Sequence, residues 1–257
     1  MALLELEHVS HRFGGLQALS NVSLGVEEGE VTALIGPNGA GKTTVFNLVT
    51  GVYRPAEGSI RLAGQELVGL SPARIVERGV ARTFQSIRLF KDLTVLDNVR
   101  VAHFARVRYG IGAWLGRSAA FRDEEDAILA TSFDLLARFG LERHAFERAG
   151  SLPYGDQRRL EIARAMATQP RLLLLDEPAA GMNPAEVERL MQLILWVRDS
   201  FGVTIFLIEH QMRVVMGICR VIHVLDFGRL IARGSPDEVR SHPRVLEAYL
   251  GKGAREA

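Results

Sequence analysis

The sequence has one cysteine, no hydrophobic run of membrane-spanning length and almost no net charge. The single cysteine, Cys219, excludes an intrachain disulfide and fits a reducing compartment. It lies in an apolar stretch, so we expect a small buried residue rather than a nucleophile. No run approaches the roughly 20 apolar residues of a transmembrane helix. The N-terminus lacks a secretory signal. We therefore expect a cytosolic chain that acts at a membrane only through a partner.

The charge balance excludes a polybasic binding protein. Lys and Arg number 31 against 30 Asp and Glu, a net charge of +1, so no nucleic-acid partner is expected. Hydrophobic residues make up 47% of the chain and charged residues 24%, which excludes a mostly disordered protein. A chain of 257 residues can bury a full core in one large domain, with or without an insertion.

Short apolar runs alternate with helical patterns at both ends of the chain. Between about residues 72 and 168, apolar residues recur every three or four positions, which predicts a helical insertion without strands. The stretch after residue 105 is punctuated by Gly110, Gly112 and Gly116. Residues beyond Gly251 are expected to form a loose tail. The predicted strands are residues 3–9, 18–24, 31–35, 59–67, 172–175, 203–208, 221–225 and 229–232.

Three of these strands, at residues 31–35, 172–175 and 203–208, are apolar throughout. Strands that are apolar on both faces are typical of a parallel sheet covered by helices on both sides. Each run ends in polar residues, and open α/β sheets bind ligands at the carboxyl ends of their strands. The pattern therefore predicts an α/β fold with a ligand site at this edge.

A glycine-rich motif of the form GxxxxGK[ST] follows the first of these strands and precedes a helical pattern. Its glycines let backbone N–H groups turn inward around phosphate oxygens, and the start of the next helix adds to the positive field. The lysine brings a cation to the outer phosphates, and the first threonine offers a hydroxyl to Mg²⁺. The predicted nucleotide-binding residues are Gly36, Pro37, Asn38, Gly39, Ala40, Gly41, Lys42, Thr43 and Thr44.

Two acidic residues, Asp176 and Glu177, follow the leucine run at 172–175. A carboxylate at the end of a buried strand beside a phosphate loop can hold Mg²⁺, and the adjacent Glu177 could polarise an attacking water. An isolated pair of this kind would more simply cap a helix or face solvent. Together with the phosphate loop, the pair predicts hydrolysis of magnesium-bound ATP or GTP.

The tripeptide Asp226-Phe227-Gly228 also occurs in protein kinases. The sequence has no His-Arg-Asp loop, and the tripeptide lies between two predicted strands. We therefore expect a hairpin turn with glycine in a conformation that other residues avoid.

Several motifs in a fixed order resemble the ATP-binding subunits of ABC transporters. After the phosphate loop come Thr83-Phe84-Gln85, the segment 152–157, the leucine run with Asp176 and Glu177, and finally Glu209-His210. The resemblance extends from Phe13 to about Leu250. It implies a P-loop NTPase core with a mostly parallel sheet, an N-terminal antiparallel β subdomain and an inserted helical subdomain. Within one domain of residues 1–257, it implies a catalytic core at about 1–85 and 169–240, a helical subdomain at about 86–168, and a C-terminal helix and tail at 241–257.

The resemblance also implies roles for single residues. Phe13 would stack on adenine, although a phenylalanine after a strand is otherwise more often core. Gln85 would touch Mg²⁺ and the attacking water and sense a membrane subunit. Glu177 would be the general base, and His210 would contact the γ-phosphate. Asp176 and Thr43 would be magnesium ligands.

The segment 152–157 departs from the Leu-Ser-Gly-Gly-Gln signature of the family. Pro153 replaces the serine, Tyr154 the first glycine and Asp156 the glutamine, while Gly155 remains. In the family this stretch opens a helix that faces the γ-phosphate bound by a second ATPase subunit. The backbone N–H groups and the helix dipole can act there without the serine hydroxyl. Residues 180–183 would lie at the interface of the two subunits.

The departures resemble one subfamily, the branched-chain amino acid importer ATPases of bacteria. They share the Pro-Tyr-Gly signature, the surroundings of Gln85, residues 179–184 and the closing Glu-Ala-Tyr-Leu-Gly. After the motif histidine this group usually has Asp, where this chain has Gln211. The resemblance implies an ATPase that binds ATP and Mg²⁺, at the cytoplasmic face of the inner membrane. Its partners would be integral permease subunits, a second identical or related ATPase, and indirectly a periplasmic or extracellular substrate-binding protein.

The sequence leaves other functions open. The ATPases of lipopolysaccharide exporters and urea-type importers are similar. A soluble ABC ATPase of DNA repair or translation usually carries paired ATPase domains or long coiled-coil inserts, which this chain lacks. A nucleotide sensor without turnover would be expected to lack Glu177.

Overall fold

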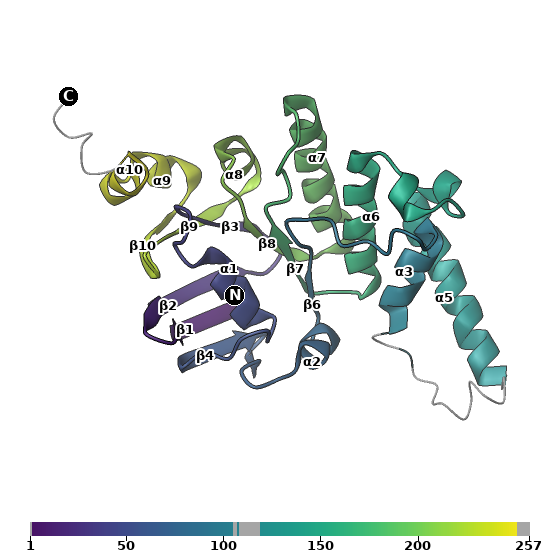
Figure 1. Ribbon diagram of the computed structural model, residues 1–257, viewed down its shortest axis with the longest axis horizontal. Coiled ribbons are helices and arrows are strands. Elements are labelled where there is room, and N and C mark those ends of the chain that lie inside the picture. Colours follow the sequence, from purple (N-terminus) through teal and green to yellow (C-terminus); the bar gives the residue numbers. More distant parts are fainter. Residues whose placement is uncertain (1, 105–106, 108–118, 251–257) are drawn as a thin grey trace. The chain divides into compact units, whose positions relative to one another are not determined.

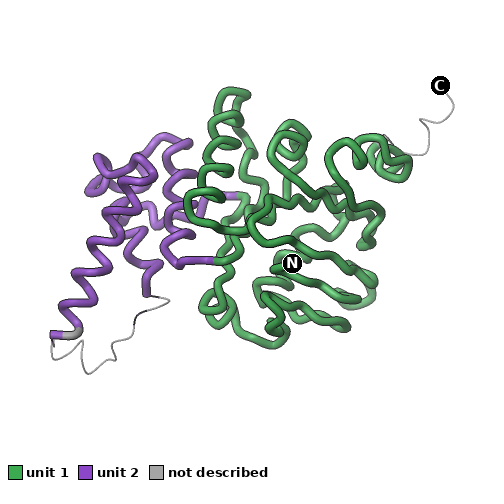
Figure 2. The backbone as a smooth tube through the Cα atoms, turned by 180° about the vertical axis from the view of Figure 1, so that it is seen from behind, with its two compact units in different colours: residues 1–85, 171–257 green, residues 86–170 purple. Residues whose placement is uncertain are grey.

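The computed structural model describes residues 2–104, 107 and 119–250. The chain forms two compact units, shown in green and purple in Figure 2. The first unit comprises Met1–Gln85 and Arg171–Ala257, and the second comprises Ser86–Pro170. The expected glycine-rich stretch at 110–116 and the expected tail beyond Gly251 lie outside the described residues.

The larger sheet of the first unit has six strands in the order β10-β9-β3-β8-β7-β6. Its central strands β3, β7 and β8 are buried at every position, as their uninterrupted apolar sequence predicts. Neighbouring strands run parallel from β9 to β6, and only β10 is antiparallel. The predicted α/β fold is thereby confirmed. The strands are β3 (Val31–Ile35), β6 (Val80–Arg82), β7 (Leu172–Asp176), β8 (Thr204–Ile208), β9 (Val221–Asp226) and β10 (Arg229–Gly234).

The second sheet of this unit is the expected N-terminal antiparallel layer. Its strands lie in the order β2-β1-β4-β5, with every neighbouring pair antiparallel. Leu4, Leu6 and Val9 of β1 are buried while Glu7 and His8 are exposed, so the layer has one face toward the core. The strands are β1 (Ala2–Phe13), β2 (Leu16–Glu27), β4 (Glu57–Leu62) and β5 (Gln65–Glu66).

Helix α1 (Lys42–Val49) joins the two sheets through one shared core. Its Phe46 ring lies 5.2 Å from the ring of Phe206 on β8, and the same cluster contains Leu4 of β1 and Ile60 of β4. Figure 1 shows α1 on one side of the larger sheet and helices α7 and α8 on the other. The remaining helices of this unit are α2 (Pro72–Glu77), α7 (Pro184–Phe201), α8 (Met212–Ile218), α9 (Pro236–Ser241) and α10 (Pro243–Leu250).

The second unit is helical, as predicted for the insertion. It contains α3 (Val95–His103), α5 (Ala119–Arg138) and α6 (Tyr154–Ala167), with short 3-10 turns at Glu142–His144 and Ala149–Ser151. Inside it, Arg158 and Glu161 form a buried ion pair with 2.7 Å between Nη1 and Oε2. Glu161 also accepts a hydrogen bond from the Arg88 backbone N–H. Because the charges are paired and the carboxylate is further hydrogen-bonded, they are tolerated in the core.

Two helices, α3 and α7, begin at residues whose side chains cap the helix. Thr94 accepts a hydrogen bond from the Asp97 N–H at the start of α3. Asn183 forms a complete capping box with Glu186 at the start of α7. Both caps satisfy backbone donors that the first helical turn leaves without partners.

One expectation about the elements was wrong. The segment after residue 72 was expected to contain no strand, but Val80–Arg82 forms β6 beside β7. Three residues are too few to show an alternating pattern, and only pairing with β7 makes them a strand. The C-terminal helix expected at 241–257 is α10, which begins at Pro243 after the short helix α9 that Ser235 caps.

Candidate nucleotide-binding and catalytic site

The phosphate loop connects β3 to α1, and two of its glycines have little room for a side chain. A Cβ atom on Gly36 would overlap the Leu225 carbonyl oxygen. A Cβ atom on Gly41, whose φ is +105°, would lie 2.7 Å from Leu19 Cδ2. These positions therefore require glycine for close packing as well as for backbone freedom. Strands β9 and β2 therefore pack directly against the curled backbone of the loop.

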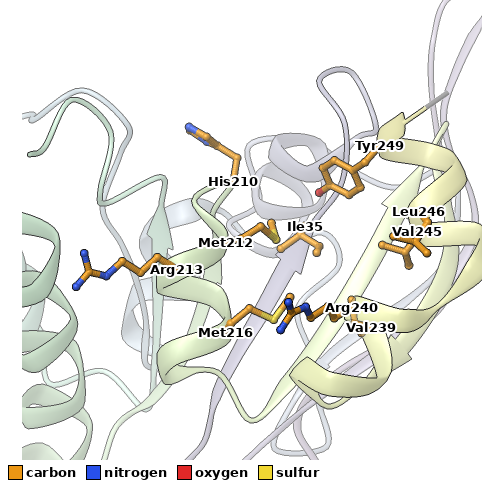
Figure 3. A pocket seen from close by; sticks show the side chains of 10 residues that line it. All are labelled: Ile35, His210, Met212, Arg213, Met216, Val239, Arg240, Val245, Leu246 and Tyr249. Carbon is orange, nitrogen blue, oxygen red and sulfur yellow. The ribbon is translucent and has the colours of Figure 1, made fainter. Parts of the chain in front are cut away.

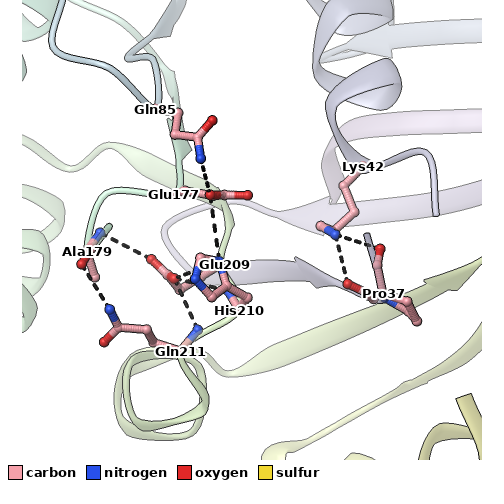
Figure 4. A network of polar contacts seen from close by, with 9 residues as sticks. Pro37, Lys42, Gln85, Glu177, Ala179, Glu209, His210 and Gln211 are labelled. Atoms are coloured by element: carbon pink, nitrogen blue, oxygen red, sulfur yellow. Dashed lines mark hydrogen bonds and ion pairs between the residues drawn. The ribbon is translucent and has the colours of Figure 1, made fainter. Parts of the chain in front are cut away.

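Lys42 is the first residue of α1 and points its ammonium into the loop. Its Nζ donates hydrogen bonds to the carbonyl oxygens of Gly36 at 2.7 Å and Pro37 at 2.9 Å (Figure 4). Burial lowers the pKa of Lys42, and the carboxylates of Glu177 and Asp176 oppose that shift. A desolvated cation held among carbonyl oxygens is placed to bind phosphate oxygens instead.

A cavity of about 510 Å³ opens beside this loop. At its rim, Phe13 packs edge-on against His11 and Tyr53, with ring centroids 4.6 Å and 5.2 Å apart. Phe13 is 41% exposed, so part of its ring remains accessible for stacking on a flat ligand. The cavity is lined by Phe13, Leu16, Gln17, Ala18, Asn38, Gly39, Gly41, Lys42, Thr43, Thr44, Glu177 and Phe227.

Phe227 belongs to this cavity although the sequence marked it only as part of a turn. The predicted hairpin is confirmed, with Asp226-Phe227-Gly228 between β9 and β10. Phe227 has a φ of +41° and is 88% exposed. Gly228 lies so close to β2 that a Cβ atom there would overlap the Ala18 carbonyl oxygen. This close packing positions the exposed ring at the cavity.

Asp176 ends β7 and is paired with Arg82 at the end of the neighbouring strand β6. The distance from Arg82 Nη2 to Asp176 Oδ2 is 2.7 Å, and both side chains are less than a tenth exposed. Arg82 also donates a hydrogen bond to Asn47 Oδ1 of α1. Sequence reasoning missed Arg82, because only the pairing of β6 with β7 brings it to this edge.

Glu177, Gln85 and His210 meet at the carboxyl ends of the strands (Figure 4). Gln85 Nε2 donates a hydrogen bond of 2.6 Å to Glu177 Oε2, and His210 Nδ1 lies 3.7 Å from the same oxygen. Glu177 has a φ of +47°, a conformation that costs non-glycine residues of order 1–3 kcal/mol and is concentrated at functional sites. The three side chains that the sequence singled out for catalysis are thus brought together.

A buried carboxylate, Glu209, shapes the turn that carries His210. Glu209 is fully buried and accepts hydrogen bonds from the backbone N–H groups of Ala179, His210 and Gln211. Gln211 in turn donates from Nε2 to the Ala179 carbonyl oxygen at 2.9 Å. The glutamine at position 211 therefore ties the turn after β8 to the turn after β7, a contact that a carboxylate could not make with a carbonyl oxygen.

The signature segment lies in the helical unit. Pro153 is the N-cap of α6 and makes no side-chain cap bond, so the helix begins without the hydroxyl that a serine would supply. Gly155 is exposed in the first turn, with open space where a Cβ would be. The positive end of the helix dipole at such a start favours a nearby anion.

Cys219 is buried, as predicted, and desolvation raises the pKa of its thiol to about 12. No group of three or more His, Cys, Asp or Glu side chains in the described part of the chain could form a metal cluster. Within the same residues, no helix combines the length and apolar character needed to cross a membrane.

A family model described as ABC transporter matches residues 19–180 of this chain. The chain belongs to the ABC transporter family. A second model, branched-chain amino acid ATP-binding cassette transporter, matches residues 229–255. The LivG protein of Salmonella typhimurium, a high-affinity branched-chain amino acid transport ATP-binding protein, is 49% identical over 250 residues, covering 97% of this chain and 98% of LivG. The resemblance read from the motifs is confirmed.

Solved structures agree with this assignment. The ADP conformation of an ATP-binding cassette of an ABC transporter superposes with a TM-score of 0.85 at 31% identity, covering 98% of this chain and 100% of the other. A dimeric cassette in a post-hydrolysis state, bound to ADP and phosphate, gives a TM-score of 0.73 at 25% identity, covering 91% of this chain and 98% of that one. The chain is therefore an ABC ATPase, and its family binds adenine nucleotides.

Proposed function

We propose that this chain energises a membrane importer of branched-chain amino acids by binding and hydrolysing ATP. The observation that carries the proposal is the convergence of Gln85, Glu177 and His210 at the edge of the phosphate-loop cavity. The substrate class is supported by the identity of 49% to LivG and by the subfamily model at the C-terminus.

In the proposed reaction the phosphate loop holds the triphosphate through its backbone N–H groups and Lys42. Glu177 takes a proton from a water molecule whose oxygen attacks the γ-phosphorus, while the bond to the β–γ bridging oxygen breaks and ADP leaves. Gln85 holds the Glu177 carboxylate in place, and His210 lies near the same carboxylate to contact the γ-phosphate. Phe13 would stack on the adenine ring.

Magnesium would be held by Thr43, Gln85 and Asp176. Hydroxyl, amide and carboxylate oxygens are the donors that Mg²⁺ prefers, and water and phosphate usually complete its shell. When bound, the ion neutralises negative charge on the phosphate oxygens. Arg82 compensates the charge of Asp176 at the buried strand end.

A second ATPase subunit would complete each site. The exposed start of α6, with Gly155 in its first turn, would face the γ-phosphate held by the partner's phosphate loop. The dimeric relative bound to ADP and phosphate supports this arrangement. ATP would favour the closed dimer more than ADP does, and that difference would drive the transport cycle.

The proposed partners are integral permease subunits, and through them an external substrate-binding protein, with this chain on the cytoplasmic face of the membrane. Affinity purification from native membranes, followed by identification of the co-purified integral proteins, tests this assignment. We expect permease subunits of an amino acid importer. Recovery of an exporter, a urea permease or only ribosomal and DNA-repair factors would overturn it.

The substrate is tested by reconstituting the purified complex in vesicles, with ATP inside and the substrate-binding protein outside, and following uptake of radiolabelled leucine, isoleucine and valine. Uptake should stop when Lys42 is replaced by alanine, because the phosphate loop then loses its cation. Unlabelled urea and acidic amino acids in excess should leave leucine uptake unchanged.

A further inference from the structure

The turn between β9 and β10 carries a residue that suits the turn poorly. Asp226 pairs with Arg229, so Phe227 and Gly228 alone form the loop. Their φ values of +41° and +74° are both positive, as in a type I′ turn. Such a turn favours asparagine before glycine, because a bulky side chain is strained at positive φ. The local structure therefore does not account for phenylalanine at position 227.

Packing in the core does not account for this phenylalanine either. Phe227 is 88% exposed, the highest value for a large apolar side chain in the described part of the chain. A phenyl ring at such a position leaves apolar surface in water and adds little to the stability of the fold. Backbone strain at non-glycine residues is concentrated at functional sites. Strain and exposure together make Phe227 a candidate for contact with a ligand.

The backbone beside Phe227 is attached to both sides of the nucleotide cavity. The Gly228 N–H donates a hydrogen bond of 3.0 Å to the Ala40 carbonyl oxygen in the phosphate loop. The Gly228 carbonyl oxygen accepts a bond of 2.8 Å from the Ser20 N–H on β2. A Cβ atom on Gly228 would overlap the Ala18 carbonyl oxygen, so the turn lies directly against β2. Phe227 is thereby held at a fixed place beside the phosphate loop.

Phe227 lines the same cavity of about 510 Å³ as Phe13 and Lys42. The Phe13 ring is held by two neighbouring aromatic rings. Two aromatic side chains from two different hairpins therefore border the space beside the phosphate loop. Phe227 also borders a cavity of about 710 Å³ between residues 37–40 and α10, where α10 contributes charged side chains. A flat apolar ligand is favoured in the first cavity, where a second aromatic ring is available.

We propose that Phe227 is a nucleoside-binding residue, a second aromatic contact for the adenine base in addition to Phe13. This inference rests on the proposed role of the phosphate-loop cavity as the ATP site. The ring acts on the nucleoside alone, because aromatic side chains stack on flat bases and offer no hydrogen-bond donor to phosphate oxygens. Phe227 therefore raises the affinity for ATP and ADP and leaves the affinity for inorganic triphosphate unchanged.

The test uses four variants of the full-length protein. Phe227→Asn removes the ring and places the favoured residue in the turn, and Phe227→Tyr keeps a ring. Leu246→Ala is the control, because it removes a partly exposed apolar side chain from a different cavity. Figure 3 shows that cavity, of about 610 Å³, with Met212 and Met216 on one side and Leu246 on the other. Lys42→Ala reports on the phosphate loop.

Calorimetry with magnesium and unlabelled ATP, ADP or inorganic triphosphate measures binding. Phe227→Asn should weaken binding of both nucleotides at least about fivefold, the lower end of the loss when one aromatic contact with a base is removed. Its binding of triphosphate should stay within about twofold. Its thermal unfolding without nucleotide should be unchanged or occur at higher temperature. Phe227→Tyr and Leu246→Ala should bind all three ligands within about twofold of the natural chain.

Four outcomes would overturn the inference. The first is equal nucleotide affinity for Phe227→Asn and the natural chain. The second is an equal loss of triphosphate binding, because the side chain would then act on the loop and not on the base. The third is a similar loss in Phe227→Tyr or Leu246→Ala. The fourth is a change confined to ATP-driven dimer formation, which would assign Phe227 to contact with the second subunit.

The same experiment separates this inference from the proposed function. If Lys42→Ala binds ATP and triphosphate as well as the natural chain, the phosphate loop is not the nucleotide site and both proposals fail. If Lys42→Ala abolishes binding while Phe227→Asn binds ATP normally, only the role of Phe227 is lost.

Discussion

Glu177 is the residue of the site with the most contacts to other predicted catalytic side chains. Its backbone takes a positive φ, its carboxylate accepts from Gln85, and His210 lies near the same oxygen. Its N–H bonds to the Ile208 carbonyl on β8, which holds the strained turn against the end of the sheet. The sheet thereby aims a carboxylate into the phosphate-loop cavity.

Replacing Glu177 with glutamine should stop turnover and preserve nucleotide binding. The amide cannot take a proton from water, and general-base catalysis commonly contributes about 10²–10⁴-fold to a rate. Phosphate release should fall by that order, and ATP should trap a dimer detectable by size-exclusion chromatography. Glu188→Gln, on the outer surface beside Arg213, should hydrolyse ATP normally. Unchanged hydrolysis by Glu177→Gln would remove Glu177 as the base.

Arg82 and Asp176 form a buried pair whose two members are 94 residues apart. Replacing Arg82 with methionine should destabilise the fold by about 3–5 kcal/mol, because it leaves the Asp176 carboxylate buried without its partner. Urea unfolding measures the loss. Arg61→Met breaks an exposed pair with Glu7 and should cost less than about 1 kcal/mol. Similar losses for the two variants would contradict this account.

At the scale of the elements, the active edge depends on where strands stop and helices start. β3, β7 and β8 end at the same edge of the sheet, and each is followed by a residue of the site: Gly36, Glu177 and Glu209. Parallel pairing brings these ends together, with Leu174 of β7 opposite Phe206 of β8. The α7 cap then begins the helix that leaves this edge.

The capping box of α7 should make a measurable contribution to stability. Asn183 Oδ1 accepts from the N–H groups of Ala185 and Glu186, both at 3.0 Å. Asn183→Ala should lower the free energy of unfolding by about 1 kcal/mol, measured by chemical denaturation. Gln192→Ala, at an exposed position of the same helix, should change it by less than about 0.5 kcal/mol. A neutral Asn183→Ala would show that tertiary packing alone starts this helix.

At the scale of the whole molecule, His223 links the two sheets of the first unit. It is fully buried on β9, and its Nε2 donates a 2.9 Å hydrogen bond to the Gly25 carbonyl on β2. Among the described residues its Nδ1 has no hydrogen-bond partner. Burial is the main cause that lowers the pKa of His223 from 6.5 to about 4, with Arg233 adding to the shift and the Gly25 bond opposing it.

Acid should therefore destabilise the protein through His223. Between pH 6.5 and about 4 the unfolded chain binds a proton that the folded chain excludes, so stability is full above this window and falls as pH drops through it. The contribution is about 3 kcal/mol. His223→Gln should flatten the pH dependence of urea unfolding by that amount. His8→Gln, at an exposed position, should leave the pH dependence of urea unfolding unchanged. If the stability of His223→Gln depends on pH as strongly as that of the natural chain, His223 is not the group responsible.

The sequence predicted local features well because these features depend on interactions between residues that are close in the chain. The apolar strands at 31–35, 172–176 and 204–208 and the glycine-rich loop all have signatures within a few residues. The edge strand Val80–Arg82 was missed because it has no such signature.

By itself, the sequence determined the fold class, the family and the residue types available for phosphate binding and proton transfer. Only the tertiary structure decided which of them meet. Arg82 reaches Asp176 across 94 residues of chain, and Gln85 reaches Glu177 across 92. Such contacts depend on strand order and on how side chains fill the space between elements. No local pattern encodes that information, because it arises only when distant segments are packed together.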